Sequence, residues 1–408
     1  MAETTQEPRI GRVEFTGSRG ELLGIILRGY LLMIPTIGLY RFWQANWKRR
    51  FYWQNTVIDG EPLEYTGTAQ QLLAGFFFAL AFFLPVYVAI FVLSMQDVDY
   101  VLLGYGGIGV VVWFMMGYAI YRARDFRLSR TLWRGIRFDM RGNAFAYAAR
   151  RFGWSLLMLP TLGLVYPWMA SSLWRYRWRN SWFGDRKFEI AGNWRAFAAP
   201  YYGAYFLNVL TIGAAAFWIA GSGDYTMVGD VPVPGPIGIA LCCACVLVFA
   251  FTLALYRTRS ASRMLSTVSL GEAKLTVNIG TGTLFWQYVL YVVAVVVLLV
   301  VLAITAAIAI GSIYVAAAAG GQEPDGGALL SMFQSGTLNV VLLVGIYLVV
   351  LGAFGLLAEV ILALGWWKLL ARSAAIANPD SVRSVRATPE DRSVVGQGLA
   401  DALNVGTY

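Results

Sequence analysis

The sequence predicts an all-α polytopic membrane protein with short cytoplasmic β-strand pieces. Three observations lead to this fold class: an extreme composition, eight long apolar stretches and an internal tandem repeat of 125 residues. Of the 408 residues, 58% are hydrophobic and only 13% are charged, whereas soluble domains carry about 25% charged residues. This composition excludes a soluble globular protein.

The absence of one residue type excludes several classes of chemistry. The chain has no His, and its three Cys (Cys242, Cys243 and Cys245) lie together in one apolar run, where we expect them to pack. Zinc catalysis, His general bases, haem ligation and a disulfide framework are therefore not expected. We predict no metal, no cofactor and no enzymatic activity. The net charge of +9 lies in short segments between apolar runs, so we expect no nucleic-acid partner.

Six of the apolar stretches are predicted to cross the membrane. A crossing helix needs about 20 apolar residues. Segments 95–100, 221–235 and 316–335 contain no Lys or Arg and are expected to face outward, which places both termini in the cytoplasm. The predicted crossings are 72–94, 101–121, 196–220, 236–256, 284–315 and 336–365.

The other two apolar stretches, 21–42 and 144–168, permit two interpretations. Both segments that flank 144–168 are rich in Arg, and a single crossing cannot leave both of its ends in the cytoplasm. Each stretch contains a Pro-Thr-x-Gly sequence, which breaks a helix and permits a left-handed turn. The favoured interpretation is a re-entrant helical hairpin, and the alternative is a kinked crossing helix. The expected turn residues are Pro35, Thr36, Gly38, Pro160, Thr161 and Gly163.

A duplication sets the predicted domain plan. A shift of 125 positions aligns residues 35–67 with 160–192 and gives eleven identities in 33 positions. A motif of alternating apolar and polar residues that ends in Gly recurs at 13–18, 63–68, 138–143, 188–193 and 276–281, and it predicts short strands. The plan comprises an N-terminal cytoplasmic tail (1–12), a first repeat unit (13–137) and a second repeat unit (138–262). A partial third repeat unit with two spans (263–372) and a polar, mobile cytoplasmic tail (373–408) follow.

These motifs together resemble the YjgN-like bacterial inner-membrane proteins, a family of unknown function. The matching pieces are FTGSRGELLG at 15–24, PTIGLYRFWQANWKRRFYWQNT at 35–56, DGEPLEYTGT at 59–68 and RTLWRGIRF at 130–138. The resemblance covers residues 13 to about 200 well, and the remainder by pattern only. In the second copy, Gly184-Asp185 replaces Asp59-Gly60, which puts the Asp-Gly turn there in doubt. The resemblance implies a multi-pass place in the bacterial inner membrane and no particular reaction.

The helix after each turn carries the first candidate contacts for an anion or a lipid. Tyr40, Trp43, Trp47 and Phe51 are spaced to form one aromatic face, with a basic cluster at the far end. This pattern is typical of an interfacial anchor, and the alternative is a specific pocket for an anionic headgroup or substrate. The candidates are Arg50 and its counterpart Arg175, Lys48, Arg49, Trp43 and Trp168, together with Arg134 and Arg137 of RTLWRGIRF.

Charged residues inside apolar stretches form a second group of candidates, because isolated charge at membrane depth is costly. Arg28 lies midway along the first descending segment, Arg150 and Arg151 lie early in the second, and Glu359 lies in the final span. Snorkelling or a structural ion pair is the alternative to a functional role for these side chains.

Two functional hypotheses follow from these patterns. The first is a transporter or channel for a small anionic solute, with a site at the broken segments. The second is a non-transporting envelope protein that binds or organises anionic lipid of the surrounding phospholipid bilayer through a cytoplasmic platform of Arg and aromatic residues. The sequence ranks transport slightly ahead, and it leaves the oligomeric state open.

Overall fold

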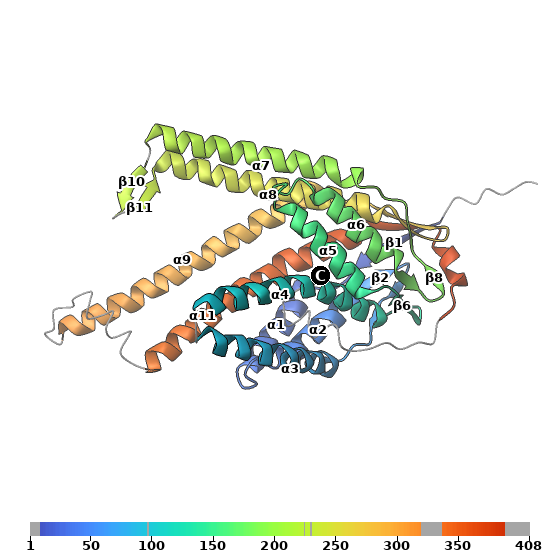
Figure 1. The fold of residues 1–408 in the computed structure, drawn as a ribbon, viewed down its shortest axis with the longest axis horizontal. Helices are drawn as coiled ribbons and strands as arrows, with labels where there is room; N and C mark the ends of the chain where they lie inside the picture. The colour runs from blue at the N-terminus through green and yellow to red at the C-terminus, as the bar shows by residue number, and fades with distance from the viewer. Residues whose placement is uncertain (1–8, 96–97, 224, 229–230, 320–336, 388–408) are drawn as a thin grey trace, which may run out of the picture. The chain divides into compact units, whose positions relative to one another are not determined.

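The computed structural model describes residues 9–95, 98–223, 225–228, 231–319 and 337–387. The chain forms two compact units. The first comprises Met1–Gly282 with Lys368–Tyr408, and the second comprises Thr283–Trp367. Most of the described residues are helical (Figure 1).

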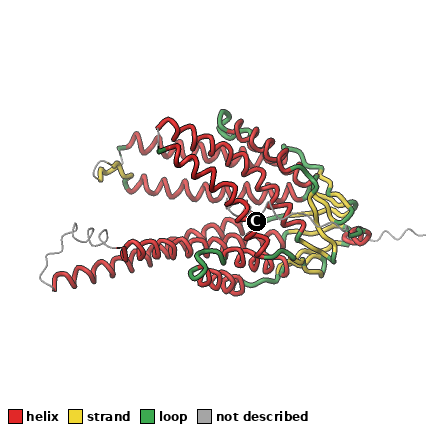
Figure 2. Tube along the Cα trace, turned by 60° about the horizontal axis from the view of Figure 1, so that its bottom comes forward, coloured by secondary structure: helices red, strands yellow, loops and turns green. Residues whose placement is uncertain are grey.

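The first unit contains a nearly closed ring of short antiparallel strands. Its strands are β1 (Ile10–Phe15), β2 (Thr56–Ile58), β3 (Glu61–Pro62), β4 (Glu64–Tyr65), β5 (Thr131–Trp133), β6 (Ile136–Met140), β7 (Ser181–Phe183), β8 (Arg186–Lys187), β9 (Glu189–Ile190), β12 (Val268–Leu270), β13 (Ala273–Val277) and β14 (Ala374–Ala377). They pair in two runs, β3-β2-β1-β14-β13-β12-β9 and β4-β5-β6-β7-β8. The runs join through Leu63, between β3 and β4, and through Phe188, between β8 and β9. Figure 2 shows these strands gathered together in yellow.

Tight turns and helical insertions alternate around the ring. Four strand pairs are joined by two residues each: Asp59-Gly60, Arg134-Gly135, Gly184-Asp185 and Gly271-Glu272. Every one of these turns has at least one residue with positive φ, which matches the twist of a two-residue hairpin. The intervening connections between strands carry pairs of helices. Because neighbouring strands run antiparallel, these helical insertions leave the ring from one rim and the tight turns lie at the other.

The four helical insertions of the first unit are helix pairs. They are α1 (Arg19–Met33) with α2 (Arg41–Gln54), α3 (Ala69–Ser94) with α4 (Val98–Ser129), α5 (Ala144–Met158) with α6 (Tyr166–Arg179), and α7 (Arg195–Ser222) with α8 (Pro236–Leu265). The bounds of α1, α2, β2, β3 and β4 recur 125 residues later as those of α5, α6, β7, β8 and β9. A separate two-stranded hairpin, β10 (Tyr225–Val228) with β11 (Val231–Pro234), joins α7 to α8.

The second unit is helical. It contains most of α9 (Thr281–Ala319), then α11 (Thr337–Leu357), a π-helical turn (Ala358–Ala363) and the start of α12 (Leu364–Arg372). Gly365 of α12 lies so close to the Gln287 side chain of α9 that a Cβ there would overlap it.

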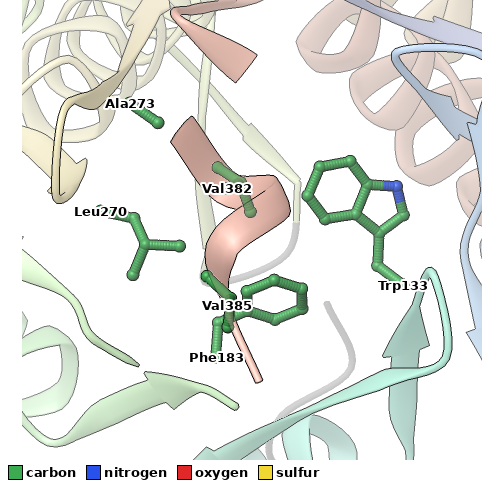
Figure 3. Packing of buried hydrophobic residues seen from close by; sticks show 6 residues of the cluster. All are labelled: Trp133, Phe183, Leu270, Ala273, Val382 and Val385. Carbon is green, nitrogen blue, oxygen red and sulfur yellow. The ribbon is translucent and has the colours of Figure 1, made fainter. Parts of the chain in front are cut away.

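An apolar cluster fills the interior of the ring. Four side chains of the strands pack on two valines near the C-terminal end of the described chain: Trp133, Phe183, Leu270 and Ala273 (Figure 3). Val382 lies in the 3-10 helix Pro379–Ser384, and Val385 follows that helix. The strands show the alternation that a one-sided core requires; in β13, for example, Ala273 and Val277 are buried and Lys274 and Thr276 are exposed. An apolar cavity of about 240 Å³ remains beside this cluster.

Six helices among the described residues are long and apolar enough to cross a membrane, which agrees with the predicted number and positions of crossings. They are Ala69–Leu93, Gly104–Ser129, Arg195–Ser222, Pro236–Leu265, Thr281–Ile308 and Val344–Arg372. The two stretches with the Pro-Thr-x-Gly sequences are each broken into two packed helices rather than continued as one kinked helix. Their re-entry into the membrane remains a prediction.

Three sequence-based expectations need correction. The fold is not all-α with isolated strand pieces, since strands from distant parts of the chain pair into one ring. The tail after Ser373 is not entirely mobile, because β14 pairs with both β1 and β13 and Val382 is buried. A tight turn also exists at Gly184-Asp185 despite the reversed order, since Gly184 at the first position adopts φ +56°.

Candidate functional site

The first helical hairpin is held together by a close approach of α1 and α2. Gly29 of α1 lies against the side chain of Gln44 on α2, where a Cβ would overlap it. The buried Gln44 Nε2 donates a hydrogen bond to the carbonyl oxygen of Ile26 at 3.0 Å. At the other end, Ser18 and Glu21 form a capping box that fixes where α1 begins.

The turn of this hairpin is made by the expected residues. Ile37 and Gly38 adopt φ values of +50° and +81°, and the Gly38 N–H donates to the Met33 carbonyl at 2.8 Å. The Thr36 hydroxyl donates to the Leu32 carbonyl at 2.6 Å and accepts from the Tyr40 N–H at 3.1 Å. The turn therefore satisfies several of its own polar groups.

A groove of about 820 Å³ runs between α1 and α2. Aromatic, small and polar side chains line it, together with three charged ones. The lining residues are Gly20, Glu21, Gly24, Ile25, Arg28, Tyr40, Gln44, Trp47, Arg50, Phe51, Gln54 and Asn55. Two candidates from different parts of the sequence pattern, Arg28 and Arg50, are thus brought to one site.

The charges of the groove are unbalanced. The Arg50 guanidinium lies over the Trp47 ring, 5.7 Å from its centroid, and Arg50 Nε is buried with no hydrogen-bond partner in the described part of the chain. Arg28 is exposed and forms no ion pair with any residue that the structure describes. Glu21, the acidic residue of the lining, is engaged in the capping box. The groove therefore offers two arginines to an anion.

Apolar side chains project outward around the turn of the hairpin. Ile37 is 94% exposed, and Leu31 and Ile34 are exposed as well. Water would meet these side chains at a free-energy cost, whereas hydrocarbon would accept them. The tip of this hairpin therefore suits contact with lipid.

The second hairpin repeats the backbone but not the groove chemistry. Gly153 stands 125 positions after Arg28, while Arg175 corresponds to Arg50. Arg150 stacks over the Tyr176 ring at 4.7 Å, and Arg151 Nη2 lies 3.8 Å from Met116 Sδ. Arg150 and Arg151 therefore contact an aromatic ring and a sulfur atom.

Helix α7 fastens the turn of the second hairpin. The hydroxyls of Tyr201, Tyr202 and Tyr205 donate hydrogen bonds to the carbonyls of Gly163, Leu164 and Leu162, at 2.9, 2.8 and 3.0 Å. The positions 125 residues earlier are Phe76, Phe77 and Leu80. The first turn therefore receives no equivalent hydroxyl from α3, where Phe76 instead packs on Phe42 with the ring centroids 5.2 Å apart.

The structure places the remaining candidates elsewhere. Arg134 lies at the rim of tight turns, where it binds Asp59 at 3.0 Å and stacks over Trp133; Arg137 lies on β6.

The candidates on the helices have partners or positions outside the groove. Arg49 donates to the Tyr65 hydroxyl at 3.2 Å, and Lys48 is half-buried on α2. Trp43 stacks on Tyr40, and Trp168 stacks on Trp194. Glu359 is half-buried in the π-helical turn and takes part in a further contact. The groove thus unites only Arg28 and Arg50 of the candidates outside the turns.

Sequence reasoning missed one group of basic residues. Arg124 of α4 and Arg177 of α6 stack over Trp178 and Trp174 at 4.9 and 5.8 Å. The signal was the density of Arg in segments 122–143 and 169–195, of which only Arg134, Arg137 and Arg175 were candidates. No cluster of His, Cys, Asp or Glu that could hold a metal ion occurs among the described residues.

Comparisons with known proteins identify relatives but no activity. The family model described as bacterial protein of unknown function (DUF898) matches residues 11–402. The inner membrane protein YjgN of Salmonella typhimurium (strain LT2) is 24% identical over 155 residues, which cover 37% of this chain. The aligned part amounts to 35% of that relative's own length. No solved structure matches. The six apolar helices and the YjgN relative support an inner-membrane location.

Proposed function

Because the chain belongs to the DUF898 family of bacterial proteins of unknown function, its activity must be argued from its own residues, and we propose that it binds anionic phospholipid in the groove between α1 and α2. The observation that carries this proposal is the pairing of Arg28 and Arg50 with Tyr40 and Trp47 in one groove of about 820 Å³. Arginine binds phosphate oxygens bidentately, and aromatic rings occupy the headgroup region of a bilayer.

The geometry of the tip supports lipid rather than an aqueous pathway. Transport through the hairpins requires water at their turns, where polar groups would line the path. Instead, Ile37 and Leu162 at the two turns are 94% and 77% exposed. The apolar side chains at these turns would contact lipid acyl chains, while the groove between α1 and α2 would bind the headgroup. The same feature makes transport the weaker of the two hypotheses.

The hydrogen bonds to the second turn support a re-entrant position for the hairpins. They place residues 162–164 beside Tyr201–Tyr205 of α7, which begins at Arg195. At 1.5 Å per residue this is about 9–15 Å along the helix axis, compared with about 30 Å of hydrocarbon. If α7 crosses the bilayer, the second hairpin enters by about a third to a half of the hydrocarbon thickness and returns. In this arrangement the strand ring lies on the cytoplasmic side with both termini, as the Lys and Arg distribution predicts.

Lipid retention tests the proposal. The full-length protein and R28Q/R50Q are purified in detergent, washed with mixed phosphatidylglycerol and phosphatidylcholine micelles, and examined by native mass spectrometry. We expect the wild type to retain phosphatidylglycerol preferentially and the variant to lose that preference. The matched control, R12Q/R195Q, removes the same charge from exposed positions outside the groove. Equal retention by R28Q/R50Q and the control would exclude the groove as the lipid site.

Thiol labelling tests the competing transport hypothesis. In a chain without Cys242, Cys243 and Cys245, single cysteines replace Thr36 and Thr161. Asp97→Cys and Lys274→Cys, the latter at an exposed position of the strand ring, mark the two sides of the membrane. The lipid proposal predicts that neither turn reacts with a membrane-impermeant reagent from outside. Labelling of either turn from outside, with Lys274→Cys unlabelled, would instead reveal an aqueous pathway.

A further inference from the structure

Buried donors without acceptors cluster where α4 and α6 approach the strand ring. Arg124 Nε, Arg177 Nε, Trp174 Nε1 and Trp178 Nε1 are all buried, and none has a hydrogen-bond partner in the described part of the chain. A buried donor without a partner costs about 1–3 kcal/mol, and more if it is charged. Four such donors in one place indicate that an acceptor belongs there.

These side chains form one stacked assembly. The guanidinium of Arg124 lies 4.9 Å from the centroid of Trp178, that of Arg177 lies 5.8 Å from Trp174, and the two indole rings are 5.5 Å apart. Stacking uses the face of a guanidinium and leaves its N–H edge available for an oxygen ligand. The indole N–H groups can donate only. The assembly therefore presents donors and no acceptor.

The charge of the assembly is not neutralised by neighbouring acids. Neither Arg124 nor Arg177 forms an ion pair with any residue in the described part of the chain. The carboxyl group of Asp125 binds a different arginine, Arg122, at 2.7 Å. Like charges in a buried site repel one another strongly because the local dielectric constant is low. An anion between Arg124 and Arg177 would remove this repulsion.

The position of the cluster fits a phosphate-bearing ligand. Arg124 lies five residues before the end of α4 at Ser129, or about 8 Å from the end of the candidate span. This is the depth of the headgroup region when the helix crosses a bilayer. Phosphate offers several oxygens to a fork of N–H donors, and arginine binds it bidentately.

We propose that Arg124 and Arg177, with the indole N–H groups of Trp174 and Trp178, form a binding site for a phosphate group between α4 and α6. This site is separate from the groove between α1 and α2 and does not depend on the function proposed for that groove. Its ligand is either the phosphate of a lipid headgroup or a free phosphate-bearing solute, which share the chemistry that these donors recognise.

Calorimetric titration of the purified, lipid-stripped full-length protein tests the site. The probes are inorganic phosphate and dihexanoyl phosphatidic acid, and the variant is R124Q/R177Q. The control is R195Q/R259Q, which removes the same charge from two exposed positions. We expect the wild type and the control to bind at least one probe equally well, and the variant to bind it about tenfold more weakly or worse.

The two probes distinguish the sources of the ligand. Binding of inorganic phosphate identifies a free solute, and binding of dihexanoyl phosphatidic acid alone identifies a lipid. If the wild type binds neither probe, or if R124Q/R177Q binds as well as the wild type, the proposal is wrong. Loss of lipid from the R28Q/R50Q variant has no bearing on these titrations, so the two proposals fail separately.

Thermal unfolding gives a second readout that does not depend on measuring an affinity. Without phosphate, R124Q relieves the repulsion with Arg177, so its Tm should equal or exceed that of the wild type. Addition of phosphate or of the short-chain lipid should raise the Tm of the wild type and leave that of R124Q unchanged. If phosphate or the short-chain lipid raises the Tm of R124Q as much as that of the wild type, Arg124 serves only the stacking and the proposal is wrong.

Discussion

Three hydroxyl groups that fasten the second hairpin give a prediction with a calculable size. Tyr201, Tyr202 and Tyr205 donate to the carbonyls of Gly163, Leu164 and Leu162 at 2.8–3.0 Å. Side-chain hydrogen bonds in membrane proteins contribute about 0.6 kcal/mol each on average. The triple Tyr→Phe variant keeps the rings and removes only the hydroxyls, so it should lower the free energy of unfolding by about 2 kcal/mol in total.

Two assays measure this loss. Unfolding in mixed micelles of dodecyl maltoside and sodium dodecyl sulfate gives the change in free energy. Hydrogen exchange gives its location, and it should accelerate at the amides of Leu164 and Tyr166, whose hydrogen bonds lie within the turn. Tyr87→Phe, at an exposed position of α3, is the matched control and should change neither measurement.

The opposite substitution extends the test to the first hairpin. If hydroxyls from the neighbouring helix fasten a turn, F76Y/F77Y/L80Y supplies them at the corresponding positions of α3 and should slow exchange at Gly38 and Leu39. If the triple Tyr→Phe variant unfolds with an unchanged free energy and exchanges as the wild type does, the hydrogen bonds contribute nothing and the assignment of a fastened turn is refuted.

Three further predictions concern the strand ring. Phe183→Ala removes a ring that is 1% exposed inside the apolar cluster and should destabilise the protein by about 3–5 kcal/mol in the same unfolding assay; a loss below about 1 kcal/mol would mean that the cluster is not tightly packed. Asp59→Asn keeps the left-handed turn but removes the carboxylate that binds Arg9 and Arg134 at 3.1 and 3.0 Å. It should lower the free energy of unfolding by about 1–3 kcal/mol. The control Asp380→Asn, at a half-exposed side chain, should lower it by less than about 1 kcal/mol. Truncation after Arg372 removes β14 from between β1 and β13 and should abolish folded protein in size-exclusion chromatography, while truncation after Ala387 should not; equal yields of the two would contradict the role of β14.

The helices were largely predictable from the sequence because their signals are local. A window of about 20 apolar residues suffices to identify a crossing, and the Pro35–Gly38 sequence marks the break between α1 and α2 without tertiary information. The strand motifs were also located correctly, since all five contain strand residues in the structure. What these cases share is that the deciding interactions lie within a few residues of one another.

The ring was not predictable because its deciding contacts are distant. Ile10 pairs with Ala377, and strands as short as Glu64–Tyr65 have no stability of their own. The sequence Ala374–Ala377 gives no strand signal, and this segment forms a strand only because it pairs with β1 and β13. Strands β2, β5, β7 and β12 could have been found from the two-residue turns that follow them, because each turn contains a Gly and comes directly after an apolar residue.

The groove was only partly predictable for a related reason. Arg50 was a candidate on account of the aromatic helix around it, and Arg28 on account of its depth in an apolar stretch. Their meeting depends on the packing of Gly29 against Gln44, which no periodicity reveals. Arg124 and Arg177 were missed because a charge run is usually a solvated face, and only the stacking on Trp178 and Trp174 distinguishes them.

The late position of β14 in the chain has a consequence for biogenesis. The ribosome makes β1 hundreds of residues before β14, and until β14 arrives both β1 and β13 present an unpaired edge. Unpaired edges are templates for aggregation with other chains. Cells that make this protein must therefore either insert its helices faster than the open edges meet one another, or shield those edges with a chaperone until translation reaches residue 377.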